Sequence, residues 1–313
     1  MVNIAIAGGT GGVGRSIAEV LAGHPSHQAV IFSRRNRNDE NSRLPLVEVD
    51  YTDVEGLKVL LEKHQINTVI CTFAIEGNSL STSQINLIRA SAMSSATRRF
   101  IPSSFAIPYP RDYVDVLPPL KYYFDSLDEL KKTDLEWTVV LNGTFMDYFG
   151  APHLKSYLKP NVFVIDMENN AAAIPGDGKN IVTLTYSLDV ARFVVAALDL
   201  ETWPQETRIV GDQITWNDFV KLAEEARGAK FDVHYDDVEK LRNFQITELP
   251  SHRALYDHFP KEKFQWFMSI FELWTAVGLS HVPSEGALNE KFPHIKPLTV
   301  KELLDRFWKE KKE

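Results

Sequence analysis

The chain has 313 residues, of which 44% are hydrophobic and 24% charged, and its 34 Lys and Arg against 42 Asp and Glu give a net charge of −8. This composition is typical of a globular protein with one large or two ordinary domains, and it excludes disorder over most of the chain. The acidic balance argues against nucleic acid as a partner, because binding to phosphate backbones needs concentrated positive charge.

Cysteine, histidine and apolar runs exclude further classes. The single cysteine, Cys71, forbids an intramolecular disulfide and any multi-cysteine metal site, and it favours a reducing compartment. The nine histidines show no spacing typical of metal ligands, and no Gly-x-Ser-x-Gly motif indicates a hydrolase. No apolar stretch approaches the roughly 18 residues of a membrane span, and the N-terminal apolar run is too short for a signal peptide. We therefore expect a cytoplasmic protein without a membrane partner or a metal.

The first half of the chain alternates short apolar runs with longer segments of helical period. The short runs are rich in Val and Ile and bounded by turn residues, as buried strands are, whereas the longer segments repeat apolar residues at three- and four-residue steps. This alternation predicts an α/β fold, a Rossmann-type doubly wound parallel sheet with helices on both faces. The expected strands are 3–7, 28–32, 46–49, 68–72, 99–102 and 138–141, and the expected helices are 14–22, 54–64, 82–95 and 120–132.

The alternation ends after Asn142. Residues 146–179 are rich in aromatic residues, Asn, Pro and Gly, residues 180–200 contain a helical pattern that predicts a helix returning to the sheet, and the chain after about Gly211 is mainly helical. We therefore expect two units. The Rossmann domain is predicted to comprise 1–145 and 180–212, and a smaller, mainly helical lobe 146–179 and 213–313.

A glycine-rich turn joins the first predicted strand to the first predicted helix. It reads Gly-Gly-Thr-Gly-Gly-Val-Gly over residues 8–14, which satisfies the form G-x-x-G-x-x-G. Such a turn lets the backbone approach a pyrophosphate, and the helix N-terminus offers unpaired N–H groups. A tight turn with close helix packing would use the same glycines, but the strand before and helix after favour a dinucleotide. The expected contacts are Gly8, Thr10, Gly11, Gly12, Val13 and Gly14.

The end of the second strand predicts which dinucleotide binds. Proteins that prefer NAD usually carry an acidic residue there, whereas this chain has Ser33, Arg34 and Arg35. Arg34 can hold a 2′-phosphate with two N–H groups and stack on adenine, and Ser33 can donate a hydrogen bond. This predicts NADPH/NADP, the alternative being a pair of surface arginines.

Two further strand ends belong to the sheet edge where such folds bind ligands. After the third strand, Asp50, beside Tyr51, can reach the adenine amine. After the fourth, Thr72, Phe73 and Ala74 can line the central span of the cofactor. An ordinary loop role would explain each group equally well.

Taken together, these segments resemble the NmrA-like, isoflavone-reductase-like branch of the atypical short-chain dehydrogenases/reductases, especially its fungal members. The resemblance rests on residues 8–14, Arg34, 50–52, 100–105, 136–148 and 187–191, and it covers about residues 1–225. It implies a Rossmann domain that binds NADP(H) and a C-terminal lobe that closes over a small-molecule substrate. For many members it also implies hydride transfer to phenylpropanoid-like or other secondary metabolites.

The reaction also needs a proton donor. The chain lacks the Tyr-x-x-x-Lys dyad of classical short-chain dehydrogenases. Reductases resembling isoflavone reductase instead use a lysine at the start of the helix before the Trp-Thr strand, where Lys121 is the nearest; beside the cofactor in an apolar pocket its pKa would fall. The family lysine usually lies about two residues further on, at Tyr123. At about 100° per residue, Tyr123 lies in the buried helix stripe and Lys121 on its flank. An exposed lysine and a core aromatic are therefore the alternatives.

Several residues are candidates for the nicotinamide and substrate end. Ser103 and Ser104 can hydrogen-bond the carboxamide or the substrate, or cap a turn. Asn142 and Gly143 end the sixth strand and would let the backbone approach the nicotinamide ribose. Aromatic side chains of the second lobe either wall a flat aromatic substrate or fill a core. Those that we expect at the substrate are Phe145, Tyr148, Phe149, His153, Phe267 and Phe271.

We therefore expect an NADPH-dependent reductase that transfers hydride to a carbonyl, imine or activated alkene of a small, aromatic or polyketide-like metabolite. The missing dyad leaves two alternatives. One is a non-catalytic NADP(H) sensor that acts through a protein partner, and the other is a redox-neutral isomerase or cyclase on the same fold.

Overall fold

The computed structural model describes residues 2–35, 43–74 and 78–309. Its first unit is a parallel six-stranded sheet in the order β3-β2-β1-β4-β5-β6, which is the Rossmann order. The predicted fold class is thus confirmed. The strands are β1 (Val2–Ala7), β2 (His27–Ser33), β3 (Leu46–Glu48), β4 (Thr68–Cys71), β5 (Arg99–Ile101) and β6 (Glu136–Trp137).

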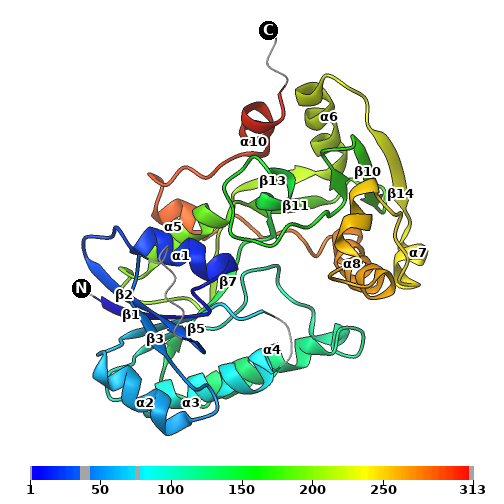
Figure 1. Cartoon of the computed structure of the whole chain (residues 1–313). Helices are drawn as coiled ribbons and strands as arrows, with labels where there is room; N and C mark the ends of the chain where they lie inside the picture. The colour runs from blue at the N-terminus through cyan, green and yellow to red at the C-terminus, as the bar shows by residue number, and fades with distance from the viewer. Residues whose placement is uncertain (1, 36–42, 75–77, 310–313) are drawn as a thin grey trace.

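Helices cover both faces of this sheet (Figure 1). In β1, Ile4 and Ile6 pack against one face, with α1 and α5, while Ala5 and Ala7 pack against the other, with α2 and α3. This explains why β1 is apolar at successive positions, since both of its faces are buried. The helices are α1 (Gly12–Leu21), α2 (Val54–Lys63), α3 (Ile85–Met93), α4 (Pro119–Leu130) and α5 (Ser187–Ala197).

Two predicted elements differ in extent from the structure. The strand expected at 138–141 corresponds to β7 (Val139–Leu141), which pairs in parallel with β12 (Glu206–Arg208), whereas the separate strand β6 precedes Thr138 and pairs with β5. The Thr138 and Thr207 hydroxyls lie 2.8 Å apart across that second pair. The helix expected at 82–95 is preceded by a π-helical turn over Ser79–Gln84 and becomes α-helical only at Ile85.

The second lobe contains two three-stranded sheets beside its helices. One sheet has the order β13-β11-β8 and the other β14-β10-β9. The helical pattern at 180–200 corresponds to α5, but strand β11 precedes it; Val182 and Leu184 alternate with threonines there, a strand period too short to stand out. The strands are β8 (Thr144–Phe145), β9 (Ile165–Asp166), β10 (Ala171–Pro175), β11 (Ile181–Thr185), β13 (Asp212–Thr215) and β14 (Asp232–Asp236).

The C-terminal part of the chain is shared between the two units. Helix α9 packs on α5, and its Leu288 belongs to the buried cluster of the Rossmann unit, against which Phe292 also packs. The range 213–313 therefore does not lie wholly in the second lobe. The remaining helices are α6 (Trp216–Arg227), α7 (Val238–Arg242), α8 (Lys261–Ala276), α9 (Leu288–Lys291) and α10 (Val300–Phe307). Within residues 2–35, 43–74 and 78–309, no helix has the length and apolar character needed to span a bilayer.

Candidate cofactor and substrate site

The glycines between β1 and α1 serve two different purposes. Gly8 has a φ of +86°, and a Cβ there would lie 2.9 Å from the Thr72 carbonyl oxygen. A Cβ on Gly14 would overlap the Thr72 hydroxyl and the Gly8 carbonyl, so these two positions need glycine for packing against β4. Gly11, in contrast, is exposed, and no atom lies within 4 Å of the position that a Cβ would take. The open side of the turn is therefore at Gly11.

The amides near this open side are partly paired and partly unpaired. The paired ones are the Gly12 N–H, which donates to the Tyr157 carbonyl at 3.2 Å, and the Arg15 N–H, which donates to the Gly11 carbonyl at 3.2 Å. No hydrogen bond is formed by the amides of Thr10, Val13 and Gly14 within the described residues. The first turn of α1 carries no acidic residue, and Gly11 provides no side-chain cap. Free N–H groups at a helix N-terminus without a competing carboxylate fit a dinucleotide pyrophosphate.

On the adenosine side, Arg34 is exposed and several neighbouring residues support the turn that carries it. No carboxylate in the described ranges pairs with Arg34. Ser33 donates its hydroxyl to the Arg35 carbonyl at 3.0 Å, which shapes the turn that carries Arg34. Tyr51 is buried and donates to the Phe32 carbonyl at 3.0 Å; burial raises its pKa, and the nearby Arg34 charge opposes that rise weakly. Tyr51 thus supports the end of β2 from behind.

Asp50 is held by a local turn. Its Oδ1 accepts from the Thr52 hydroxyl at 2.7 Å and from the Thr52 N–H at 2.8 Å, and these two bonds lower its pKa. The carboxylate is exposed, and its second oxygen accepts no hydrogen bond within the described residues.

Three hydroxyl groups expected to face ligands instead join strand ends. Thr72 donates to the Ala7 carbonyl at 2.9 Å, and Ser103 to the Phe73 carbonyl at 2.7 Å. Ser104 accepts from the Val140 N–H at 2.9 Å, so its hydroxyl joins the segment after β5 to β7, and its role at the substrate stays a prediction. A residue that the sequence did not single out, the buried Gln84, accepts from the Ser103 N–H at 2.8 Å and donates to Ser126 at 2.9 Å. These bonds hold the segment after β5 against the π-helical turn and α4.

Asn142 and Gly143 pack against the second lobe. Gly143 is buried with a φ of +72°, and a Cβ there would overlap the Thr183 carbonyl of β11. The lack of a side chain at Gly143 therefore lets β11 pack closely against this residue, whereas we expected it to let the backbone approach the nicotinamide ribose. Asn142 is fully buried; it donates to the Gly143 carbonyl at 3.1 Å, while its Oδ1 has no partner within the described chain.

The structure contradicts the expectation for Lys121. Its side chain is 62% exposed and pairs with Asp125 one helical turn away, with Nζ and Oδ2 2.6 Å apart. The hydrogen bond and charge of Asp125 raise its pKa, whereas catalysis from an apolar pocket would need a lowered one. The helical period places Lys121 outside the buried stripe, and this position argues against Lys121 as the catalytic residue. Tyr123, in contrast, is only 5% exposed.

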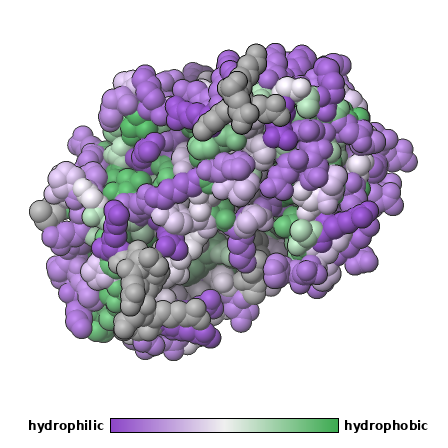
Figure 2. Space-filling model, turned by 45° about the horizontal axis from the view of Figure 1, so that its top comes forward, coloured by the Kyte–Doolittle hydropathy of each residue, from purple (hydrophilic) through white to green (hydrophobic). Residues whose placement is uncertain are grey.

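Tyr123 belongs to an aromatic cluster that joins the two units. Its ring centre lies 5.2 Å from that of Tyr109, edge to face, and Tyr109 contacts Trp274 of α8 at 6.0 Å. On the same helix Phe271 contacts Trp274 at 4.9 Å and Phe267 at 4.8 Å. Figure 2 shows a recess near the middle of one face with apolar side chains in its wall. The residues of this aromatic cluster are Tyr109, Tyr123, Phe267, Phe271 and Trp274.

Three phenol groups and the buried indole N–H of Trp274, which has no partner within the described residues, are polar groups of this region. Burial raises the pKa of Tyr109, and the neighbouring Tyr123 and Tyr148 hydroxyls add to the effect. Burial likewise raises the pKa of Tyr123 and of Tyr148. All three phenols are therefore neutral near pH 7 and can donate hydrogen bonds.

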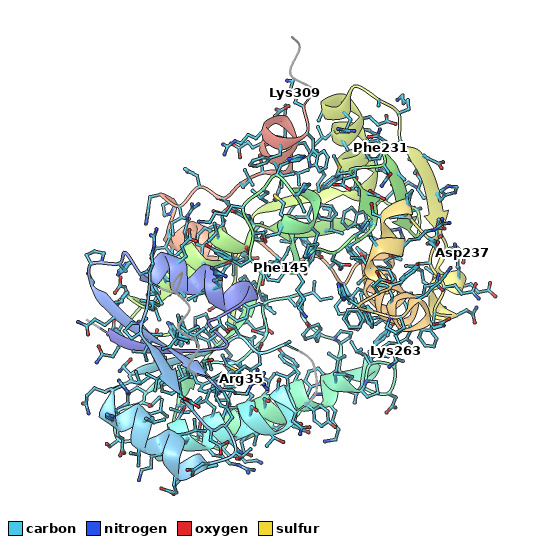
Figure 3. The ribbon with its side chains drawn as sticks, in the orientation of Figure 1. Arg35, Phe145, Phe231, Asp237, Lys263 and Lys309 are labelled. Atoms are coloured by element: carbon cyan, nitrogen blue, oxygen red, sulfur yellow. The ribbon has the colours of Figure 1, made fainter. Side chains whose placement is uncertain are left out.

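The other aromatic candidates differ in position. Phe145 is partly buried, contacts Tyr148 edge to face at 6.5 Å, and lies where the two lobes meet (Figure 3). Phe149 is wrong as a substrate residue, because it is buried in the core of the second lobe, 4.9 Å from Phe219. His153 is exposed and packs on the Trp308 ring at 5.1 Å, so its role at the substrate stays a prediction.

The sequence also missed a contact between the lobes. Residues 155–158, here called the strap, lie against the start of α1: beyond the bond from Gly12 to Tyr157, Lys155 pairs with Glu19 at 2.6 Å. These partners are more than 130 residues apart, so no local pattern could indicate them.

Fold and site together define an NAD(P)H-binding oxidoreductase. The sequence model of a family described as NAD(P)H-binding matches residues 8–201. Oxidoreductase BOA1 of Botryotinia fuckeliana is 34% identical over 301 residues, 95% of this chain and 96% of that protein. An isoflavone reductase homolog of Nicotiana tabacum is 24% identical and covers 97% of each chain. The leucoanthocyanidin reductase–NADPH complex of Vitis vinifera matches with a TM-score of 0.73 at 16% identity, over 97% of this chain and 99% of that one.

The chain therefore belongs to the NAD(P)H-binding family of that sequence model, and its relatives are oxidoreductases, with similarity to isoflavone reductase homologs. This confirms the family, the enzymatic class and the dinucleotide cofactor predicted from the glycine turn.

Proposed function

We propose that the protein is an NADPH-dependent reductase that transfers hydride to a small, neutral, aromatic or polyketide-like metabolite. The observation that carries this proposal is the aromatic cluster between α4 and α8, which adjoins Phe73 at the end of β4. Stacked and edge-to-face rings favour a flat apolar ligand, and phenol groups favour one with hydrogen-bond acceptors. A carbonyl compound has both properties.

The preference for NADPH rests on Arg34. Its guanidinium follows β2 directly, is exposed, and has no carboxylate partner within the described residues. An exposed guanidinium can form two parallel hydrogen bonds to a 2′-phosphate, and no acidic residue stands at this strand end to hold the 2′-hydroxyl of NADH.

Tyr123 is the residue that we propose as proton donor. Bound NADPH supplies the hydride, and the substrate oxygen then needs a proton. Burial raises the pKa of the Tyr123 phenol and so keeps it protonated; the phenol can donate a hydrogen bond to the substrate oxygen and pass its proton to the more basic alkoxide that hydride transfer leaves. Tyr123 also stands where related reductases carry their lysine, whereas Lys121 faces solvent.

The purified protein tests this proposal in a turnover assay. NADPH oxidation is measured with a panel of quinones, enones and aryl ketones, and with matched carboxylated analogues. We expect steady turnover of neutral aromatic carbonyl compounds and little of the charged analogues. Tight NADPH binding without turnover would instead support a sensor, and conversion of a compound without NADPH consumption an isomerase or cyclase. The variant Lys121→Met serves as control, because an exposed side chain should leave turnover unchanged.

A further inference from the structure

The strap lies across the first turn of α1. Its Tyr157 carbonyl accepts from the Gly12 N–H at 3.2 Å, and its Leu158 side chain is the nearest group to Gly12, 3.8 Å from the position of a Cβ. On the outer face of α1, Glu19 accepts from Lys155 Nζ at 2.6 Å and from the Tyr157 hydroxyl. A segment of the second lobe thus contacts the turn that binds the dinucleotide.

The strap is fixed from behind by a buried carboxylate. Asp147, which is 2% exposed, accepts from the Ser156 hydroxyl at 2.5 Å and from the Ser187 N–H, at the start of α5, at 2.8 Å. The Tyr186 hydroxyl donates to the Lys155 carbonyl at 2.6 Å. The first two residues of the strap are therefore anchored from behind, and its position against α1 does not depend on exposed ion pairs alone.

Arg15 is the cation that the strap holds. Its guanidinium carbon lies 4.6 Å from the centre of the Tyr157 ring. No carboxylate pairs with Arg15 in the described part of the chain, and the acid one turn further on, Glu19, is already engaged by Lys155 and Tyr157. Long side chains on a helix lean toward its N-terminus, which here carries the free amides of Val13 and Gly14.

We propose that Arg15 is a pyrophosphate-binding residue of the cofactor site, held in place by the Tyr157 ring. A guanidinium can form two parallel hydrogen bonds to phosphate oxygens. An aromatic ring orients the guanidinium without neutralising its positive charge. The second lobe would then contribute to cofactor affinity through the strap. This role is independent of the substrate proposed above, because it concerns the cofactor alone.

The pyrophosphate is common to NADPH and NADH, which separates Arg15 from Arg34. Affinities are measured by calorimetry for NADPH, NADH, ADP, which has a pyrophosphate but no 2′-phosphate, and 2′-AMP, which has no pyrophosphate. In Arg15→Gln we expect the Kd for NADPH, NADH and ADP to rise about tenfold, as for a charge-assisted contact, and that for 2′-AMP to stay constant. Arg89→Gln, which removes an exposed arginine on α3, is the matched control and should change none of them.

A second variant tests the role of the strap. Tyr157→Leu removes the ring, and we expect the Kd for ADP to rise about threefold, as for one cation–π contact. In the Arg15→Gln background the same change should have no effect, because the ring then has no cation to hold. Tyr157→Phe keeps the ring and should retain affinity for ADP.

Three results would overturn the proposal. They are an unchanged Kd for ADP in Arg15→Gln, an equal loss for ADP and 2′-AMP, and a Tyr157→Leu effect that persists without Arg15. Thermal unfolding of each variant shows whether it is folded, and Arg15→Lys, which keeps the charge but not the flat fork, provides a milder change if Arg15→Gln is unstable.

Discussion

The proposed phosphate end and the proposed substrate end of the site differ in their chemical groups. The phosphate end has the backbone amides of the glycine turn together with Arg34 and Arg15, neither of which has a carboxylate partner in the described ranges. At the substrate end, rings from α4 and α8 pack against one another, and the polar groups are neutral phenols such as Tyr109 and Tyr123. The first end is suited to a fixed, highly charged ligand, and the second to an uncharged one.

This difference teaches where variation in the site should act. Amides and guanidinium groups bind through charge, so changes there should alter the affinity for the cofactor and its dependence on salt. Rings bind through area and shape, so changes there should alter the Michaelis constant or the rate for the substrate. The predictions below test that separation.

The largest effect is expected at the substrate end. Tyr123→Phe keeps the ring in the aromatic cluster but removes the proton donor, and kcat should fall by about 10²- to 10⁴-fold, as for loss of general acid catalysis. Calorimetry should show an unchanged Kd for NADPH. If kcat is retained while the affinity for NADPH falls, Tyr123 serves the cofactor and the separation fails.

The next effect belongs to the phosphate end. Arg34→Ala should raise the Kd for NADPH by about ten- to a hundredfold through loss of a bidentate charge-assisted contact, with little change for NADH. Binding titrations of both cofactors measure the ratio. Equal losses for the two would show that Arg34 does not contact the 2′-phosphate.

The stability of the folded protein should fall at acid pH, through two buried histidines that belong to neither end of the site. Burial lowers the pKa of His27, despite the opposing charge of Asp199, and also that of His252. The folded protein therefore takes up these protons less readily than the unfolded chain, so the stability is fully present above the ordinary histidine pKa of about 6.5 and is lost as the pH falls below it. Each histidine contributes up to about 1.4 kcal/mol per pH unit.

Denaturant unfolding at several pH values measures this slope. His252→Gln should make it shallower, because it removes one of the two buried histidines. A stability that does not depend on pH in this range would mean that neither buried histidine resists protonation.

The smallest effect is again at the substrate end. Phe271→Leu keeps an apolar side chain on α8 but removes a ring, which should raise the Michaelis constant for a flat aromatic substrate by a few-fold, as for loss of about 1 kcal/mol of ring contact. The Kd for NADPH should not change. Steady-state kinetics with one aromatic and one aliphatic carbonyl substrate would sharpen the result, because only the aromatic one should be affected.

The parts of the molecule that follow from local pattern were predictable. The Rossmann sheet was predictable because strand and helix periods alternate over short distances. The glycine turn was predictable because the motif lies within seven residues. The period of α4 already placed Lys121 on the flank of the buried stripe, which the structure confirms with its exposed ion pair.

The parts that depend on distant partners were not predictable. Ser104 bonds to β7, Gly143 packs on β11, and Tyr157 contacts α1 more than 130 residues away. In each case the residue type allowed both a ligand contact and a structural one, and only the folded arrangement decides between them. For Phe149 and His153 the aromatic character was clear, but the direction in which each faces was not.

The return of the chain to the Rossmann unit through α9 limits how this protein can be re-engineered. Since Leu288 fills the first core while α10 packs on α6 in the second, the polypeptide passes back and forth between both halves. Chimaeras that graft the specificity half of one relative onto the nucleotide half of another by a single junction would leave a hole where α9 belongs. Such a chimaera needs several junctions, so that residues 281–296 come from the same protein as the nucleotide half.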